Sequence, residues 1–192
     1  MDSSIYRSVN HLSRRTPWLH PAAVCFAKFG IGLFALALLV AWWRGRRESD
    51  PAIVARAVST GLAVFAALGA TQLLGHVVER ARPYDMMPSA QVLISRTTDF
   101  SFPSDHATAA GAVAMGLWFV GRRLGLIAVA LAVLMALARV YVGAHYPSDV
   151  VAGLLVGAGT VIGVNRILNP GVTRLVSDLN GTPLRLVISA NK

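Results

Sequence analysis

The sequence predicts an all-α integral membrane protein: a bundle of about five transmembrane helices with a short N-terminal interfacial helix. Three observations lead to this prediction. The 192 residues are 55% hydrophobic and only 14% charged, which is too apolar for an ordinary soluble domain. Long apolar runs that carry almost no charge recur along the chain. Basic residues gather between these runs, as they do beside membrane spans.

The five spans are expected at about 21–43, 53–79, 105–120, 124–143 and 147–165. The first ends in Trp-Trp-Arg-Gly-Arg-Arg and has a long apolar core, so it is not a cleavable signal peptide. The apolar runs of the last three spans are shorter than the roughly 20 residues that cross a bilayer. They reach a spanning length only if the neighbouring polar residues are counted into the helices, which makes those polar residues candidates for function.

Two further segments flank the spans. Residues 4–15 predict a short helix at the membrane surface, capped by Ser3 or Ser4 and followed by Pro17. Its apolar face consists of Ile5, Val9 and Leu12. We expect one membrane-embedded domain over residues 1–168 and a short, polar, cytoplasmic tail over 169–192. The tail residues that discourage a long helix are Pro170, Gly171, Gly181 and Pro183.

The distribution of basic residues predicts the orientation in the membrane. Most of the positive charge lies in the loops at 44–50 and 121–123 and in the tail, which five spans place on one side. The residues are Arg44, Arg46, Arg47, Arg122, Arg123, Arg166, Arg174, Arg185 and Lys192. The positive-inside rule makes this side cytoplasmic and puts the N-terminus and the 80–104 loop outside. The formal net charge of +9 is therefore expected to meet anionic lipid rather than nucleic acid.

Polar residues that composition does not explain gather at the outer ends of four predicted spans. They are Arg80, Arg82, Ser104, Asp105, His106, Arg139, His145 and Asp149. Each alone has an ordinary role, such as a snorkelling arginine, an N-cap serine or an aspartate at a helix start. Ionisable groups at membrane depth are costly, however, and four converging groups of them predict a functional site.

The residue types suit phosphoryl transfer. Arginine forks match phosphate oxygens, and the helix start at Ser104 provides an anion site. Two histidines can serve as nucleophile and general acid. Asp149 follows His145 by four residues, a helical spacing that would let it hold one ring nitrogen and leave the other free. No cluster of Cys, His or carboxylate residues suggests a metal site, and we expect no metal and no cofactor.

These residues resemble the signature motifs of the type 2 phosphatidic-acid phosphatase superfamily. The matching segments are Arg82-Pro83, Pro103-Ser104-Asp105-His106, and Arg139 followed by His145 and Asp149. The resemblance implies metal-independent hydrolysis of a membrane lipid phosphate. It assigns phosphate binding to Arg82, Ser104 and Arg139, the general acid to His106, the nucleophile that becomes phosphohistidine to His145, and its orientation to Asp149. Asp105 and Arg80 are expected at the same phosphate.

The sequence departs from the family pattern at two positions. Gly75, with His76 beside it, stands where the family has a lysine, and Arg80 or Lys28 is expected to replace the charge. Asp105 stands where the family commonly has glycine. Pro-Ser-Asp-His, together with Tyr6…Asn10-His11-Leu12 and the run from Gly143 to Pro147, is similar to the bacterial undecaprenyl-diphosphate phosphatase branch. That branch implies action at the outer face of the bacterial plasma membrane.

Other functions remain open at this stage. Within the enzyme class, the alternatives are a phosphatidic-acid, phosphatidylglycerophosphate or prenyl-phosphosugar phosphatase, because the motifs read the phosphate and not the lipid tail. A lipid-phosphate-binding or transport protein is the alternative from another class. Binding alone does not require a nucleophile with an orienting aspartate, and phosphate release from a lipid diphosphate separates the two classes.

Overall fold

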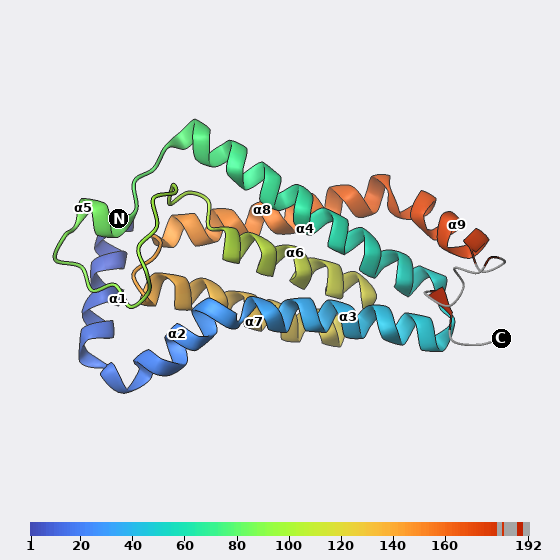
Figure 1. Ribbon diagram of the computed structural model, residues 1–192, viewed down its shortest axis with the longest axis horizontal. Helices are drawn as coiled ribbons and strands as arrows, with labels where there is room; N and C mark the ends of the chain where they lie inside the picture. The colour runs from blue at the N-terminus through green and yellow to red at the C-terminus, as the bar shows by residue number, and fades with distance from the viewer. Residues whose placement is uncertain (180–181, 183–187, 190–192) are drawn as a thin grey trace.

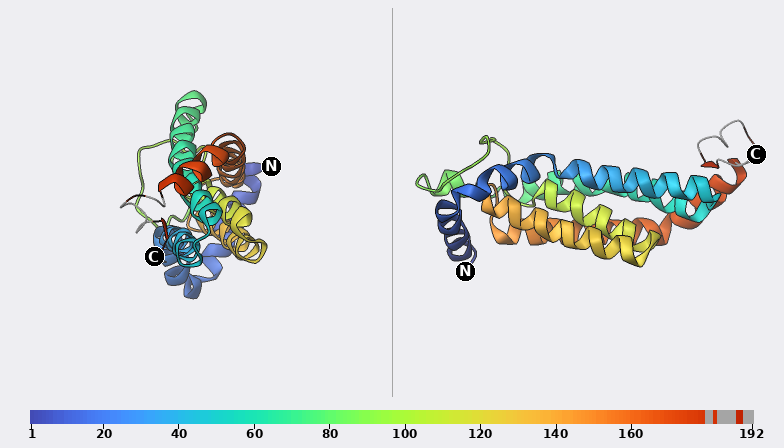
Figure 2. Two further views of the ribbon diagram at one scale, coloured as in Figure 1. Left: turned by 90° about the vertical axis from the view of Figure 1, so that its right-hand side faces the viewer. Right: turned by 90° about the horizontal axis from the view of Figure 1, so that it is seen from below.

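The computed structural model describes residues 1–179, 182 and 188–189, and these residues form helices and connections without a strand. Its elements are α1 (Asp2–Arg15), a 3-10 turn (Pro17–Leu19), α2 (His20–Phe29), α3 (Ile31–Glu48), α4 (Pro51–Val78), α5 (Pro83–Met86), α6 (Asp105–Val120), α7 (Arg122–Tyr141), α8 (Pro147–Ile167) and α9 (Asn169–Leu179). The long helices run along a common axis, and α1 lies across one end of them (Figures 1 and 2). The predicted fold class is confirmed.

The helices lie close to the predicted spans, and α6 has the predicted bounds. Among the described residues, the helices of α4, α7 and α8 are long and apolar enough to cross a membrane, and the segments Pro17–Phe29 and Ile31–Glu48 pass the same test as a pair bent by 51°. α6 has only 16 residues, and ten of them are buried. It lies in the middle of the bundle, where the longer helices surround it (Figure 1).

The first span differs from the prediction of one helix over 21–43. It is broken at Gly30 and continues to Glu48. A Cβ atom at Gly30 would lie 2.4 Å from the carbonyl oxygen of Phe26 and 2.8 Å from the terminal methyl carbon of Met135 in α7, so the bend has no room for a side chain here. Because α3 is longer than predicted, its basic residues lie on its last turns and not in a loop.

The connections on this side are correspondingly short. Only Ser49 and Asp50 join α3 to α4, and the Asp50 carboxylate caps α4 by accepting hydrogen bonds from the backbone of Ala52 and Ile53. Arg122 and Arg123, predicted in a loop, form the first turn of α7.

The N-terminal helix turns a polar face to the protein. Tyr6, Asn10 and Ser13 are buried, whereas Ile5 and Leu12 are each 53% exposed. The Asn10 side chain exchanges two hydrogen bonds with the backbone of Gln91, at 2.7 and 3.0 Å. The exposed apolar face fits a helix at a membrane surface. The predicted serine cap is wrong, because the helix begins two residues earlier than expected, with Met1 at the N-cap and no side-chain cap.

The C-terminal segment contains more structure than the polar tail that the sequence predicts. α9 has 11 residues, and its Val176 packs against Val54 and Ala55 of α4. Pro170 and Gly171 lie within the first turn of α9, where proline is tolerated because that turn has backbone N–H groups without helical partners. Gly181, Pro183, Arg185 and Lys192 lie outside the described residues.

Close packing of α6 against α8 depends on glycine. A Cβ atom at Gly157 would overlap the carbonyl oxygen of Thr108, and one at Gly153 would lie 2.6 Å from the carbonyl oxygen of Ser104. Small residues let membrane helices approach closely. This approach carries the start of α6 to the start of α8, where the predicted site residues lie.

We predict that Gly157→Ala destabilises the protein by about 1–3 kcal/mol, because the added methyl group would force α6 and α8 apart. Gly159→Ala is the matched control, since a Cβ there meets nothing within 4 Å. Thermal unfolding of the detergent-solubilised protein measures both variants. Equal melting temperatures for the two variants would show that the contact between α6 and α8 adapts to the methyl group.

Candidate active site

A cavity of about 340 Å³ lies at the end of the bundle nearest α1. It is enclosed by α4, the segment that follows α4, the start of α6, the end of α7 and the connection to α8. The predicted site residues that line it are His76, Arg82, Asp105, His106, Arg139 and His145. The fold thus brings together residues up to 69 positions apart in the sequence.

His145 lies at the centre of the site and is 2% exposed. Its Nδ1 atom is 2.8 Å from the carbonyl oxygen of Ser101. A carbonyl oxygen only accepts, so Nδ1 carries the proton and Nε2 keeps its lone pair as an acceptor. Burial lowers the pKa of His145, and the charges of Arg139 and Arg82 act in the same direction. The ring is therefore a neutral imidazole with Nε2 available for attack.

Nε2 points between two guanidinium groups. It lies 3.4 Å from Nη1 of Arg82 and 3.4 Å from Nη2 of Arg139. Both arginines are buried, at 6% and 7% exposure. An anion bound by this pair would be in contact with Nε2, which is the arrangement that in-line attack on phosphorus requires.

Asp149 has a different place from the one that the sequence predicts. Its Oδ2 atom is 3.8 Å from Nδ1 of His145, too far for a hydrogen bond. It accepts instead from the Ser101 hydroxyl at 2.5 Å, the Tyr146 backbone N–H at 2.9 Å and Arg80 at 2.6 Å. Asp149 is therefore connected to His145 through Ser101, whose carbonyl oxygen is the direct partner of the ring.

Two buried polar groups near the cavity have no hydrogen-bond partner in the described part of the chain. One is Nε of Arg139, and the other is the hydroxyl of Ser104. Ser104 is the N-cap of α6 and lies between Pro103 and Asp105, both of which line the cavity. Buried polar groups are normally paired, so these two are suited to a bound anion.

Arg82 is held from several sides. It donates to the Asp99 carboxylate at 2.9 Å, to the Asp99 carbonyl oxygen at 3.2 Å and to the Ala144 carbonyl oxygen at 3.1 Å. Burial alone would raise the pKa of Asp99, but hydrogen bonds from Thr97 and Arg82 outweigh it and lower the pKa. Asp99 is thus a charged carboxylate that neutralises Arg82, and sequence reasoning did not single it out.

The two residues at the start of α6 have separate environments. The ring of His106 lines the cavity and makes no hydrogen bond to the residues that the structure describes, which leaves it free for a substrate oxygen. The carboxylate of Asp105 accepts from the Thr71 hydroxyl at 2.7 Å and from the Gln72 amide at 3.1 Å. Asp105 therefore ties α6 to α4, and a carboxylate that accepts these bonds does not itself bind phosphate.

The candidates for replacing the family lysine are not placed alike. Arg80 is outside the cavity lining and forms ion pairs with Asp149 and Asp2, which corrects the expectation that it binds phosphate. Lys28 is an exposed residue of α2 and does not line the cavity either. His76 does line it, with its ring centroid 5.5 Å from that of Phe100.

A metal-binding group is not evident in this geometry. Among the residues that the structure describes, no cluster of three or more His, Cys, Asp or Glu side chains is placed to hold a metal ion. The positive charge in the cavity comes from Arg82 and Arg139.

Comparisons with known proteins agree with the motif reading. Residues 56–171 match the PAP2 superfamily. The chain is 31% identical over 156 residues to the undecaprenyl-diphosphatase BcrC of Bacillus subtilis (strain 168), covering 81% of this chain and 78% of that protein. It is 39% identical over 134 residues to the decaprenylphosphoryl-5-phosphoribose phosphatase of Mycobacterium tuberculosis (strain ATCC 25618 / H37Rv), covering 69% and 70%.

A solved structure shares the fold. A transmembrane PAP2-type phosphatidylglycerolphosphate phosphatase from Bacillus subtilis superposes with a TM-score of 0.67 at 22% identity, covering 86% of this chain and 83% of that one. The family match spans more than half of the chain and includes the three signature motifs between Arg82 and Asp149. The chain belongs to the PAP2 superfamily, as its motifs predict, and is a membrane lipid phosphatase of that family.

Proposed function

We propose that this phosphatase hydrolyses undecaprenyl diphosphate to the monophosphate at the outer face of the bacterial plasma membrane. The observation that carries the proposal is His145, whose unprotonated Nε2 lies 3.4 Å from both Arg82 and Arg139. The diphosphate substrate is supported by the similarity to the undecaprenyl-diphosphatase BcrC. An apolar groove beside the cavity supports a long lipid tail.

The geometry suggests two chemical steps. Nε2 of His145 attacks the terminal phosphorus, the bond to the bridging oxygen breaks, and undecaprenyl phosphate leaves as the anion or with a proton from His106. Water then attacks the phosphohistidine, His106 accepts its proton, and inorganic phosphate departs with the histidine restored. Arg82, Arg139 and the start of α6 stabilise the charge that develops on the phosphoryl oxygens.

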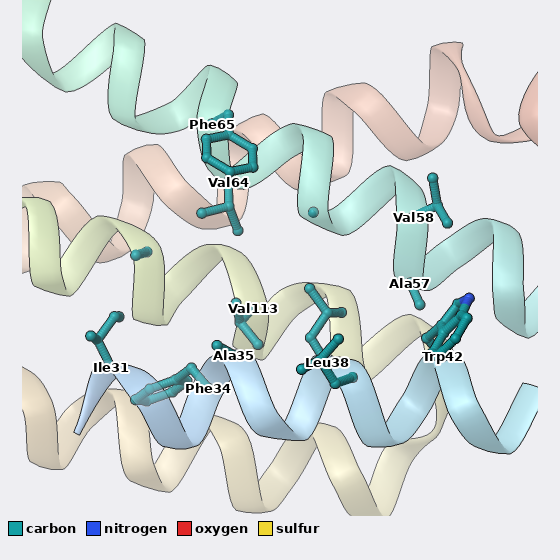
Figure 3. A pocket seen from close by; sticks show the side chains of 13 residues that line it. Ile31, Phe34, Ala35, Leu38, Trp42, Ala57, Val58, Val64, Phe65 and Val113 are labelled. Atoms are coloured by element: carbon teal, nitrogen blue, oxygen red, sulfur yellow. The ribbon is translucent and has the colours of Figure 1, made fainter. Parts of the chain in front are cut away.

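The apolar groove has a volume of about 590 Å³ and opens between α3 and α4 over α6. Figure 3 shows side chains of α3 on one side, those of α4 on the other, and Val113 of α6 between them. Its lining includes Phe34, Leu38, Val64 and Phe65 and no charged residue. Such a groove suits a branched hydrocarbon chain and offers nothing to a polar ligand.

The groove and the cavity follow one another along the same two helices. On α6, Asp105 lines the cavity and Ala109, one turn on, lines the groove. On α4, Gln72 lines the cavity and Phe65, about two turns away, lines the groove. A lipid whose phosphate lies in the cavity can therefore extend its tail along the groove.

A substrate panel in detergent tests the proposal. We predict that kcat/KM for undecaprenyl diphosphate exceeds that for phosphatidic acid and phosphatidylglycerophosphate by about tenfold or more, because a long prenyl tail makes more apolar contacts in the groove. The measurement is phosphate release by the purified protein. A higher value for either glycerolipid would overturn the assignment of the substrate.

Two glycine variants on α4 provide the matched control for the groove. Gly61→Leu places a side chain in the groove, whereas Gly69→Leu makes the same change at an exposed position that meets nothing within 4 Å. We expect Gly61→Leu to lower kcat/KM for undecaprenyl diphosphate about tenfold and to spare a short prenyl diphosphate. Equal effects of the two variants would remove the groove from the tail-binding proposal.

We predict that His145→Gln abolishes turnover while the protein remains folded, because the nucleophile is lost. Quenched wild-type enzyme should carry acid-labile, alkali-stable phosphate, and the variant none. His11→Gln, a change at an exposed histidine of α1, is the control and should retain wild-type rates. Full activity in His145→Gln would contradict the phosphohistidine mechanism.

The proposed orientation places α1, the cavity and the 87–104 segment outside, and α9 inside. It is supported by the arginines at the far end of the bundle, on the last turns of α3 and the first turn of α7. We predict that a cysteine at the exposed Ser89 reacts with an impermeant thiol reagent in intact cells, and that one at Arg122 does not. Both measurements use a Cys25→Ala background. The reverse labelling pattern would place the active site in the cytoplasm.

A further inference from the structure

The guanidinium group of Arg80 lies beside the active site but does not line its cavity. Its Nη1 atom donates to the carboxylate of Asp149 at 2.6 Å and to the hydroxyl of Ser148 at 2.6 Å. Its Nη2 atom donates to the carboxylate of Asp2. The group also lies 4.0 Å from the ring centroid of Tyr146, within cation–π distance. Arg80 is thus fixed against Asp149 at a position outside the lining of the cavity.

Arg80 reaches the nucleophile along two short connections. Its side chain bonds Asp149, which accepts from the Ser101 hydroxyl at 2.5 Å. Its backbone carbonyl accepts from the Ser101 N–H at 2.8 Å. The Ser101 carbonyl in turn accepts from Nδ1 of His145 at 2.8 Å. Ser101, the direct partner of the histidine, is therefore held by Arg80 both directly and through Asp149.

The need to balance the charge of Asp149 explains the position of Arg80. Asp149 is fully buried, and a buried carboxylate without a counter-ion is strongly unfavourable. The two other arginines near His145 are engaged elsewhere, Arg82 with Asp99 and Arg139 with the carbonyl of Ala27. In the described part of the chain, Arg80 is the cation that forms an ion pair with Asp149.

The N-terminal helix completes the arrangement. The Asp2 carboxylate accepts from the Ser148 N–H at 3.0 Å and from the Ser148 hydroxyl at 2.6 Å, and it pairs with Arg80. Burial alone would raise the pKa of Asp2, but hydrogen bonds from Ser148 and Arg80 outweigh it and lower the pKa. Asp2 is therefore charged at neutral pH, and it fixes Arg80 against the first turn of α8.

We infer that Arg80 is a positioning residue for the nucleophile, acting through Asp149 and Ser101 on His145, and that Asp2 of α1 holds Arg80 in place for this role. The inference rests on the phosphatase chemistry of His145 and not on the identity of the lipid. The N-terminal helix is on this view part of the catalytic apparatus. It contributes the Asp2 carboxylate, which accepts from Arg80. Arg80 in turn donates to Asp149, the hydrogen-bond partner of Ser101.

Kinetics of Arg80→Gln test the inference. We expect kcat to fall about 10- to 100-fold, as it does when outer partners of an oriented histidine are removed, with KM and the inhibition constant of inorganic phosphate within about twofold of wild type. Arg80→Lys should recover part of kcat because it retains the charge. A weaker affinity for inorganic phosphate with kcat unchanged would show that Arg80 binds the substrate phosphate, and would overturn the inference.

A double-mutant cycle tests the part assigned to Asp2. Asp2→Asn should lower kcat about three- to tenfold, which corresponds to about 0.7–1.4 kcal/mol. In the Arg80→Gln background the same change should have no further effect, because its route to the histidine is already lost. Effects that simply add would show that Asp2 does not act through Arg80. Asp85→Asn, which removes a negative charge from the exposed surface of α5, is the control and should leave kcat unchanged.

The two proposals fail in distinguishable ways. If wild-type protein releases phosphate from phosphatidic acid but not from undecaprenyl diphosphate, the proposed substrate is wrong, and Arg80→Gln is measured with phosphatidic acid. Melting temperatures of the detergent-solubilised variants accompany the rates. If Arg80→Gln does not fold, Asp2→Asn decides alone: unchanged kcat in that variant would contradict the inference.

Discussion

The buried carboxylate of Asp149 is the constraint on which the cavity end of the molecule depends. A negative charge with no exposure to water must have hydrogen-bond donors on every side, or its desolvation would outweigh the folding energy of a small domain. Here the donors come from Ser101, from the backbone of Tyr146 and from Arg80. They belong to three separate parts of the chain. Satisfying one anion therefore fixes how α4 ends, how the chain enters α6 and how α8 begins.

The catalytic cavity results from this fixed arrangement together with small residues. Gly153 and Gly157 let α8 approach α6 closely, and the approach sets the start of one helix beside the start of the other. The Ser104 backbone N–H then donates to the carbonyl oxygen of Asp149 at 3.1 Å, although the two residues are 45 positions apart. The polar residues alone would not ensure this, because long side chains on α6 or α8 would separate the helix starts. The apolar packing below the site is thus part of its geometry.

Much of this arrangement could be predicted from the sequence. Apolar run length and the positions of arginine predicted the spans, and motif spacing predicted that Arg82, His106, Arg139 and His145 meet. These signals are local or periodic. The alternating direction of successive spans is enough to place the marked residues on one side of the membrane. The bend at Gly30 and the extra turns of α3 were missed, because they depend on contacts with Met135 and on a two-residue connection that composition does not reveal.

The hydrogen-bond network behind His145 was harder to predict for a related reason. A spacing of four residues predicted a direct bond from Asp149 to His145, but His145 lies before the helix and not within it, so the helical spacing does not apply. Ser101 had no motif to mark it beyond its place before Pro103. Asp2 had none at all, since it lies 78 residues from Arg80. Contacts of this kind come from tertiary packing, which a single sequence does not encode as a pattern.

The shortness of α6 has a consequence for the surrounding lipid. Sixteen residues rise only about 24 Å, whereas the hydrocarbon layer of a bilayer is about 30 Å thick. If the far end of α6, at Val120, lies at the membrane surface, its start, with Ser104 and His106, lies within the hydrocarbon layer. A headgroup would then sink, or the bilayer would thin, for the phosphate to reach His145. The hydrophobic mismatch between α6 and the bilayer then affects how easily a lipid headgroup reaches the cavity. Access of the substrate therefore depends on the thickness of the membrane.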